Sequence, residues 1–268
     1  MAGRVYYSDS EPPAGSRGTA APDVSIVVPT YNERERIAEL AAAIFDVFRA
    51  HSLDGELVVV DDNSPDGTGA VAETLRASLP RVHVVHRGGK LGLGSAVMEG
   101  FHAATAPVVG VMDADFSHPP DALPSLLAAL RSSGADAVVG SRYIRGGAVR
   151  NWPIGRRLMS RLAALLARPI TPVRDATSGF FLMRRAVTRG VTIRAGGFKI
   201  CLELLLRASV SSIVETPYVF TDRTSGQSKM NYREAMGYLT QLRQLYALRF
   251  FGPRRPRPTY RQVAGRAA

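Results

Sequence analysis

The first half of the chain alternates short apolar runs with segments whose apolar residues recur at helical spacing. The runs are rich in valine and isoleucine and read VSIVVPT at 24–30, ELVVVDD at 56–62, RVHVVHR at 81–87 and PVVGVMDAD at 107–115. Between them, segments such as ERERIAELAAAIFDVFRA at 33–50 place apolar residues three and four positions apart. This alternation predicts an α/β fold built on a mostly parallel sheet.

Beyond about residue 145 the pattern is less regular. It predicts amphipathic helices at 154–170 and 231–252, the second with an apolar stripe at residues 235, 236, 239, 242, 245, 246 and 250. Between these two helices it predicts a short apolar run at 177–185, a helix at 198–209 and a strand at 212–223. We therefore expect one domain over residues 23–251, with the last folded element ending near Phe251.

The two ends of the chain have a different composition from this domain. Residues 1–22 are rich in proline, glycine, serine and alanine and lack the apolar core of a signal peptide, which predicts a disordered leader. Residues 252–268 are basic and interrupted by prolines, which predicts a basic tail. Since no run approaches the roughly 18 apolar residues of a spanning helix, we expect a chain that does not cross a membrane.

Charge and cysteine content narrow the classes of partner and compartment. A net charge of +11 on 268 residues predicts attraction to nucleic acid, anionic lipid or phosphorylated small molecules, without choosing among them. Cys201 is the one cysteine, which excludes an internal disulfide framework and a multi-cysteine zinc site. It predicts an inert, semi-buried thiol in a reducing compartment.

Candidate chemistry concentrates where the predicted strands end, at the edge where parallel α/β sheets bind ligands. Asp113 and Asp115 end the fourth strand, and two carboxylates so close together can hold a hard divalent cation that in turn holds a diphosphate. The alternative is that one of them caps the following turn.

The other strand ends carry similar alternatives. Asp61 and Asp62 end the second strand, where they can accept hydrogen bonds from a nucleobase or ribose or can form an Asx-turn. In PTYNERE at 29–35, Asn32 is expected to cap the next helix, with Glu33 near its positive end. The segment HRGGKLGLGSAV at 86–97 fails the phosphate-loop pattern and predicts a glycine-rich turn into a helix. The five histidines show no metal-ligand spacing and are expected at surface or turn positions.

Eight motifs occur together and in one order along residues 23–251. They are VSIVVPTYNERERI, VVVDDNSPDGT, GLGSAVMEGF, MDADFSHPP, GSRYIRGG, DATSGFFLMRR, GFKICLELLLRA and DRTSGQSKM. In this combination the chain resembles the family 2 glycosyltransferases, and among them the dolichol- or polyprenyl-phosphate mannosyltransferases. The resemblance implies a GT-A fold, a Rossmann-like sheet flanked by helices and followed by C-terminal amphipathic helices. Residues 23–145 would form the nucleotide-sugar and metal half, and residues 146–251 the acceptor half.

The resemblance also implies roles for individual residues. The donor nucleotide sugar would be contacted by Pro29, Tyr31, Glu33, Val60, Asp62, Asp113, Ala114, Asp115, Arg142, Arg223 and Lys229. Mg²⁺ or Mn²⁺ would be held by Asp113 and Asp115, and by Ser117 through water or not at all, since some members have glutamine there. Arg156 and Ser160 would bind the acceptor phosphate, and with Asp115 they are the expected catalytic residues.

The implied reaction moves a sugar, with inversion, from a nucleotide diphosphate to a polyprenyl monophosphate, with GDP-mannose as the expected donor. A UDP-sugar donor, with glucose or an N-acetylhexosamine, is the alternative within the same mechanism. A lipid acceptor would place the protein on the cytoplasmic face of a membrane, where its basic amphipathic helices could lie on anionic lipid; the alternative is that those helices pack against the sheet. A membrane-protein partner is a further expectation, since many bacterial relatives continue into spanning helices.

A basic nucleic-acid-binding protein without catalytic activity is the remaining alternative. The chain has no RNP motif, zinc finger or recognisable helix-turn-helix, and its paired aspartates would not contribute to nucleic-acid binding. We therefore expect no nucleic-acid partner.

Overall fold

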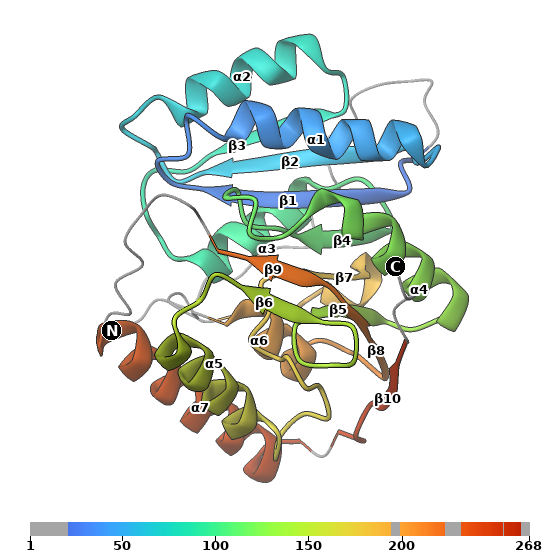
Figure 1. The fold of residues 1–268 in the computed structure, drawn as a ribbon, viewed down its shortest axis with the longest axis vertical. Helices are drawn as coiled ribbons and strands as arrows, with labels where there is room; N and C mark the ends of the chain where they lie inside the picture. Colours follow the sequence, from blue (N-terminus) through green and yellow to red (C-terminus); the bar gives the residue numbers. More distant parts are fainter. Residues whose placement is uncertain (1–20, 194–198, 223–231, 254, 264–268) are drawn as a thin grey trace.

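The computed structural model describes residues 21–193, 199–222, 232–253 and 255–263. Its helices and strands, in chain order, are β1 (Val24–Thr30), α1 (Ile37–Ala50), β2 (Gly55–Asp61), α2 (Thr68–Ser78), β3 (Val82–His86), α3 (Leu93–Ala103), β4 (Val108–Val111), η1 (Pro120–Ala122), α4 (Leu123–Ser133), β5 (Ala137–Ser141), β6 (Ala148–Arg150), α5 (Ile154–Ala167), β7 (Phe181–Arg184), η2 (Arg185–Thr188), α6 (Ile200–Arg207), β8 (Ser212–Pro217), β9 (Val219–Thr221), α7 (Tyr232–Phe251) and β10 (Thr259–Gln262). Helices flank a central sheet (Figure 1).

The central sheet has eight strands in the order β10-β8-β5-β7-β4-β1-β2-β3. All neighbouring strands pair in parallel except at β7, which runs antiparallel to both β4 and β5. Because β4 and β5 both oppose β7, they run in the same direction, and the carboxyl ends of β1, β2, β4 and β5 share one edge. The mostly parallel α/β sheet that the sequence predicts is confirmed.

Each face of the sheet has its own apolar core, which explains the continuous apolar runs in the strands. On one face Val27, Val58 and Val60 pack with residues of α3, α6 and α7. On the other face Ile26 and Val59 pack with residues of α1, α2 and α4. Since side chains alternate along a strand, a run buried on both faces needs apolar residues at nearly every position.

The strands of the first half are close to their predicted bounds, but the first helix is not. α1 begins at Ile37 with Arg36 at the N-cap position and no side-chain cap. Asn32 has a φ of 62° and lies in the turn before this helix, so the expectation that it caps the helix is wrong. The sequence pattern also missed α4 and β5, whose residues 123–141 follow the paired aspartates.

The two C-terminal helices that the sequence predicts to be amphipathic, α5 and α7, pack in different ways. α5 buries only two alanines, Ala164 and Ala167, and exposes large apolar side chains that include Ile154, Leu158, Met159, Leu162, Leu165 and Leu166. α7 instead buries Tyr238, Leu242 and Leu245 in the core beneath the sheet. The expectation that the helices pack on the sheet therefore holds for α7 and fails for the exposed apolar face of α5.

The folded part of the chain does not end at Phe251, as the basic and proline-rich composition suggested. α7 ends there, but β10 follows within the predicted tail and pairs in parallel with β8 at the edge of the sheet. Pairing with an existing strand supplies the hydrogen bonds that this short polar segment could not form alone.

Within the described residues no helix is both long and apolar enough to span a bilayer. Cys201 is fully buried in the core, not semi-buried as predicted, and burial raises the pKa of its thiol well above the ordinary value.

Candidate functional site

The loops that follow β1 and β2 start from paired positions. Pro29 in β1 is the register partner of Val60 in β2, so Tyr31 and Asp62 follow two adjacent strand ends. Tyr31 is partly exposed, and the Lys90 ammonium lies 4.4 Å from the centre of its ring. The edge of the sheet where β1 and β2 end therefore carries an aromatic ring, Tyr31, and a cation, Lys90, next to Asp62.

Asp61 and Asp62 have different partners. Asp61 accepts hydrogen bonds from the Ser64 backbone N–H at 3.1 Å, from the Ser64 hydroxyl and from the Thr30 hydroxyl at 3.2 Å. Those bonds fix the turn into α2, so the turn interpretation applies to Asp61. Asp62 makes no such turn and pairs instead with an arginine.

That arginine is Arg87, which follows β3. Its side chain is 1% exposed and donates to the carboxylate of Asp62, to Glu99 Oε1 at 3.1 Å and to Ser95 Oγ at 2.5 Å. Burial raises the pKa of Asp62, against the lowering effect of Arg87. Asp62 is thus a rigidly held acceptor. The sequence pattern missed Arg87, since nothing local marks a buried cation in a glycine-rich segment.

The two carboxylates after β4 lie in a turn. β4 ends at Val111, and the Asp113 backbone N–H donates to His118 Nδ1 at 3.1 Å. Asp115 Oδ1 accepts the Ser117 backbone N–H at 3.0 Å, so Asp115 caps the turn as the alternative interpretation expected. Ala114 and Ser117 are buried beside them.

His118 lies in the turn after β4, one of the two positions expected for the histidines, but it is buried and not at the surface. It is 2% exposed, and its ring stacks on Phe180 at 5.2 Å between centroids. Burial lowers its pKa, although Asp113 and Asp115 act in the opposite direction. Because Nδ1 accepts a backbone N–H, the ring is a neutral imidazole with its proton on Nε2. His118 therefore orients the Asp113 turn without neutralising it.

The residues at this turn fit a hard divalent cation. The Asp113 side chain is 45% exposed and offers carboxylate oxygens, the ligands that Mg²⁺ and Mn²⁺ prefer. A side chain at Gly179 would place its Cβ 3.3 Å from Asp113 Oδ2 and 3.1 Å from the His118 ring, so glycine keeps that approach open. No group of three or more His, Cys, Asp or Glu among the described residues could hold a metal. A cation here would take its remaining ligands from substrate and water.

Arg142, at the end of β5, is held by a buried carboxylate. Its Nε and Nη2 each donate to Asp175 at 2.7 Å, and its backbone N–H donates to the same side chain at 2.9 Å. Burial alone would lower the pKa of this guanidinium, yet Asp175 raises it, so Arg142 remains charged. Its guanidinium carbon also lies 5.5 Å from the centres of the Trp152 and Phe220 rings.

Arg156 and Ser160 lie on consecutive turns of α5. Arg156 Nη1 donates to Asp222 Oδ2 at 2.7 Å, and its guanidinium lies 4.3 Å from the centre of the Trp152 ring. Ser160 Oγ accepts the Tyr143 hydroxyl at 2.7 Å, which leaves the Ser160 proton available for donation. The expected acceptor residues are therefore both oriented by neighbours.

A cavity of about 450 Å³ joins these parts of the site. Asp113 lines it together with Arg156, Ser160 and the loop residues Thr177, Ser178 and Gly179. Its apolar wall comes mainly from α5 and α7, with Met159, Leu162, Ala163, Leu166, Tyr238 and Leu239. The lining thus combines a carboxylate, an arginine with a serine hydroxyl, and a group of apolar side chains.

The predicted site residues are only partly united by this cavity. Asp113, Arg156 and Ser160 line it; Arg142 touches Thr177 in its wall at 3.3 Å. Pro29, Val60 and Asp62 lie at adjacent strand ends. Glu33 follows β1, and its backbone N–H donates to the Thr68 hydroxyl at 2.9 Å. Arg223 and Lys229 lie outside the described residues. The sequence pattern assigned no role to Arg87, His118, Asp175 or Asp222.

The chain is similar to proteins of known function and structure. Residues 25–192 match the sequence model of glycosyl transferase family 2. A dolichol-phosphate mannosyltransferase of Pyrococcus furiosus is 42% identical over 83% of this chain, and a polyprenol monophosphomannose synthase of Mycolicibacterium smegmatis is 41% identical over 79% of the chain and 83% of its own length. The chain spans 63% of the length of the Pyrococcus protein.

Solved structures show the same fold at lower identity. A mannosyltransferase of Pyrobaculum calidifontis, in complex with GDP-Man and Mn²⁺, superposes with a TM-score of 0.62 at 20% identity, covering 92% of this chain and 70% of that one. Glucosyl-3-phosphoglycerate synthase of Mycobacterium tuberculosis gives a TM-score of 0.61 at 23% identity, covering 87% of this chain and 81% of that one. With the family match and these relatives together, the chain belongs to glycosyl transferase family 2.

Proposed function

We propose that this protein transfers mannose from GDP-mannose to the phosphate of a polyprenyl monophosphate, with inversion at the anomeric carbon. The observation that carries the proposal is the cavity that joins Asp113 to Arg156 and Ser160 and is walled by apolar residues of α5 and α7. A nucleotide-sugar site needs a carboxylate such as Asp113, the acceptor phosphate needs Arg156 and Ser160, and a prenyl chain needs the apolar residues of α5 and α7. The names of the relatives support mannose as the sugar and a dolichol or polyprenol phosphate as the acceptor.

The reaction needs little general acid–base catalysis from the protein. A phosphate monoester has a second pKa of about 6, so the acceptor oxygen is ionised at neutral pH. That oxygen attacks the anomeric carbon while the bond from carbon to the nucleoside diphosphate breaks and GDP leaves. Catalysis can then consist of alignment and charge stabilisation.

The described residues divide this work between them. Arg156 and the Ser160 hydroxyl would bind and aim the acceptor phosphate, with Asp222 and Tyr143 holding them in place. Asp62, fixed by Arg87, would accept hydrogen bonds from the nucleoside. Asp113 and Asp115 would hold Mg²⁺ or Mn²⁺, which when bound supplies positive charge for the leaving diphosphate. Arg223 and Lys229 are proposed to assist that same group.

We also propose that the protein works at a membrane surface, on the cytoplasmic face. The apolar face of α5 is exposed, with Leu158 61% and Leu165 65% accessible, and Arg157 and Arg161 are exposed on the same helix. α7 lies beside it, because the Tyr238 hydroxyl donates to the Ala163 carbonyl at 2.6 Å and the Tyr246 hydroxyl to that of Leu166 at 2.7 Å (Figure 1). An apolar face rimmed by arginines suits an anionic bilayer.

Replacing Arg156 by alanine is expected to raise KM for the polyprenyl phosphate roughly 10-fold or more, because a hydrogen-bonded charge is lost. KM for GDP-mannose should change little. Initial rates with each substrate varied in turn measure both constants. Arg49→Ala removes an exposed arginine from α1, a helix that contributes no residue to the cavity, and should leave both constants unchanged. Equal loss for both substrates in Arg156→Ala would contradict the acceptor role.

Leu158→Glu combined with Leu165→Glu is expected to weaken binding to vesicles of phosphatidylcholine and phosphatidylglycerol by about 10-fold or more, since two apolar side chains can no longer enter the bilayer. Sedimentation with vesicles measures the bound fraction, and circular dichroism checks that the fold is retained. Leu91→Glu changes a side chain of similar exposure, 57%, that does not belong to α5, and it should bind like the wild type. Unchanged binding of the α5 variant would remove this face as the docking surface.

Transfer of labelled sugar to a short polyprenyl monophosphate tests the proposed function directly. GDP-mannose, UDP-glucose and UDP-N-acetylglucosamine are offered separately, each with Mg²⁺, with Mn²⁺ or with a chelator. Metal-dependent mannosyl lipid is the expected product. Product from a UDP-sugar alone would replace the donor and keep the mechanism, and absence of product from every donor would overturn the acceptor assignment.

A further inference from the structure

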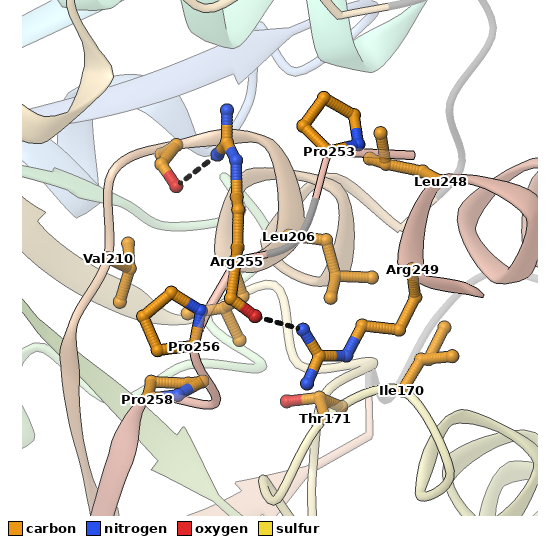
Figure 2. Close-up of a pocket in the computed structure, with 12 residues that line it drawn as sticks. Ile170, Thr171, Leu206, Val210, Leu248, Arg249, Pro253, Arg255, Pro256 and Pro258 are labelled. Carbon is orange, nitrogen blue, oxygen red and sulfur yellow. Dashed lines mark hydrogen bonds between the residues drawn. The ribbon is translucent and has the colours of Figure 1, made fainter. Parts of the chain in front are cut away.

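The segment that follows α7 is tied to the rest of the protein by two arginines. Arg255 Nη1 donates to the carbonyl oxygens of Arg207 at 2.7 Å and Ala208 at 3.0 Å, where α6 ends. Arg249, in the last turn of α7, donates to the Arg255 carbonyl at 2.7 Å (Figure 2). Carbonyls at a helix C-terminus lack partners within the helix and attract cations, so this attachment is favourable.

Prolines stiffen the same segment and lead it to the sheet. Pro253, Pro256 and Pro258 line a small cavity of about 40 Å³ together with Ile170 and Leu206 (Figure 2). Immediately afterwards β10 pairs with β8, with Tyr260 opposite Ile213 and Gln262 opposite Glu215. The segment is therefore directed onto the edge of the sheet.

From β10 a chain of hydrogen bonds leads into the interior. The Tyr260 hydroxyl donates to Glu215, whose carboxylate is fully buried in β8. The same carboxylate accepts the backbone N–H groups of Arg174 and Asp175, each at 2.9 Å. Burial and Glu215 both raise the pKa of Tyr260, so its hydroxyl keeps the proton that it donates.

The next links reach the wall of the functional cavity. Asp175 holds Arg142 through two bonds of 2.7 Å, and its carbonyl accepts the Ser178 N–H at 3.1 Å. Arg142 Nη2 also donates to Thr177 at 3.3 Å. Thr177, Ser178 and Gly179 line the cavity, and Gly179 lies against Asp113. The position of this wall relative to Asp113 thus depends on where Glu215 holds the backbone at residues 174 and 175.

We infer that Tyr260 and Glu215 are positioning residues for the reaction: through the backbone at 174–175 they place the Asp175–Arg142 pair and the wall at 177–179 against Asp113. The expected change in kcat rests on the proposed function, whereas the expected movement of the Asp175–Arg142 pair does not. Neither residue lines the cavity, so any effect of either one on transfer must pass through the loop at residues 174–179.

Tyr260→Phe is the direct test, because it removes one hydroxyl and keeps the ring. We expect kcat to fall about 10-fold, since small displacements of positioned groups have large kinetic effects. KM for the polyprenyl phosphate should stay near the wild-type value. Thr259→Val is the matched control: it removes a hydroxyl from the same strand that bonds the Ser211 carbonyl at 3.4 Å and has no link to Glu215.

A second measurement reads the site without any substrate. Trp152 is the one tryptophan of the chain and lies 5.5 Å from the Arg142 guanidinium. Its emission should therefore shift when the Asp175–Arg142 pair moves, in Tyr260→Phe and in Glu215→Gln but not in Thr259→Val. Because Tyr260 and Glu215 act on the same loop, the loss of kcat in the double variant should be smaller than the product of the two single losses.

The outcomes separate this inference from the proposed function. A Trp152 shift confined to Tyr260→Phe and Glu215→Gln supports the positioning role, even if no donor gives product and the proposed function fails. Wild-type emission and wild-type kcat in Tyr260→Phe would overturn the inference. So would equal changes in Thr259→Val, because the effect would then come from a general loosening of β10.

Discussion

Asp115→Asn is expected to reduce sugar transfer by about 100-fold or more, whereas the fold remains intact. In the wild-type protein Asp115 Oδ1 caps the turn by accepting the Ser117 N–H at 3.0 Å. The amide oxygen of asparagine can still accept this hydrogen bond. The negative charge that would hold a divalent cation is lost. Initial rates over a titration of Mg²⁺ or Mn²⁺ measure the loss, and circular dichroism checks the fold.

The matched control for this variant lies a few residues further along. Asp121→Asn removes an exposed carboxylate from η1, away from the cavity, and should leave transfer and metal dependence unchanged. Binding of GDP with Mn²⁺, measured by calorimetry, should weaken in Asp115→Asn and not in Asp121→Asn. Full transfer activity in Asp115→Asn would remove the metal interpretation of the paired carboxylates.

Asp175→Asn is expected to lower the free energy of unfolding by about 3–5 kcal/mol, because it leaves a buried guanidinium without its counter-charge. The side chains of Arg142 and Asp175 are 7% and 0% exposed, so water cannot replace the lost partner. Urea denaturation followed by circular dichroism measures the change.

Two further variants distinguish charge burial from simple loss of a contact. Asp222→Asn breaks the pair with Arg156, whose side chains are 27% and 18% exposed, and should cost no more than about 1 kcal/mol. Arg142→Met combined with Asp175→Leu removes both charges and should recover much of the stability lost in Asp175→Asn. An Asp175→Asn variant as stable as the wild type would show that Arg142 finds another partner.

Local patterns were sufficient for the strands and for the positions of the loops between them. The run at 24–30 is β1 with the predicted bounds, because a valine-rich segment bounded by polar residues has few alternatives. The order of strands and helices then places Asp62 and Asp113 after two strands of one parallel sheet. Neither step requires knowledge of distant contacts.

The partners of the charged residues were beyond the reach of such patterns. Arg142 and Asp175 are 33 positions apart, and Arg87 and Asp62 are 25 apart, so only the folded chain brings them together. His118 is polar and follows a predicted turn, but the rings of Phe180, Tyr218 and Phe220 enclose it. β10 was missed for a related reason: its stability comes from β8 and not from its own composition.

The reversed strand β7 has a consequence for how the protein acquires its structure. Leu182 is the register partner of Gly110 in β4 on one side and of Val138 in β5 on the other. In the sheet, β7 is thus the hydrogen-bonded link between the strands that lead to Asp113 and those that lead to Arg142. Residues 181–184 follow both neighbouring strands in the chain and pair with them over long sequence separations, and contacts of that kind form slowly. The pairing of β7 is therefore the step that joins the strand leading to Asp113 and the strand leading to Arg142 within one sheet.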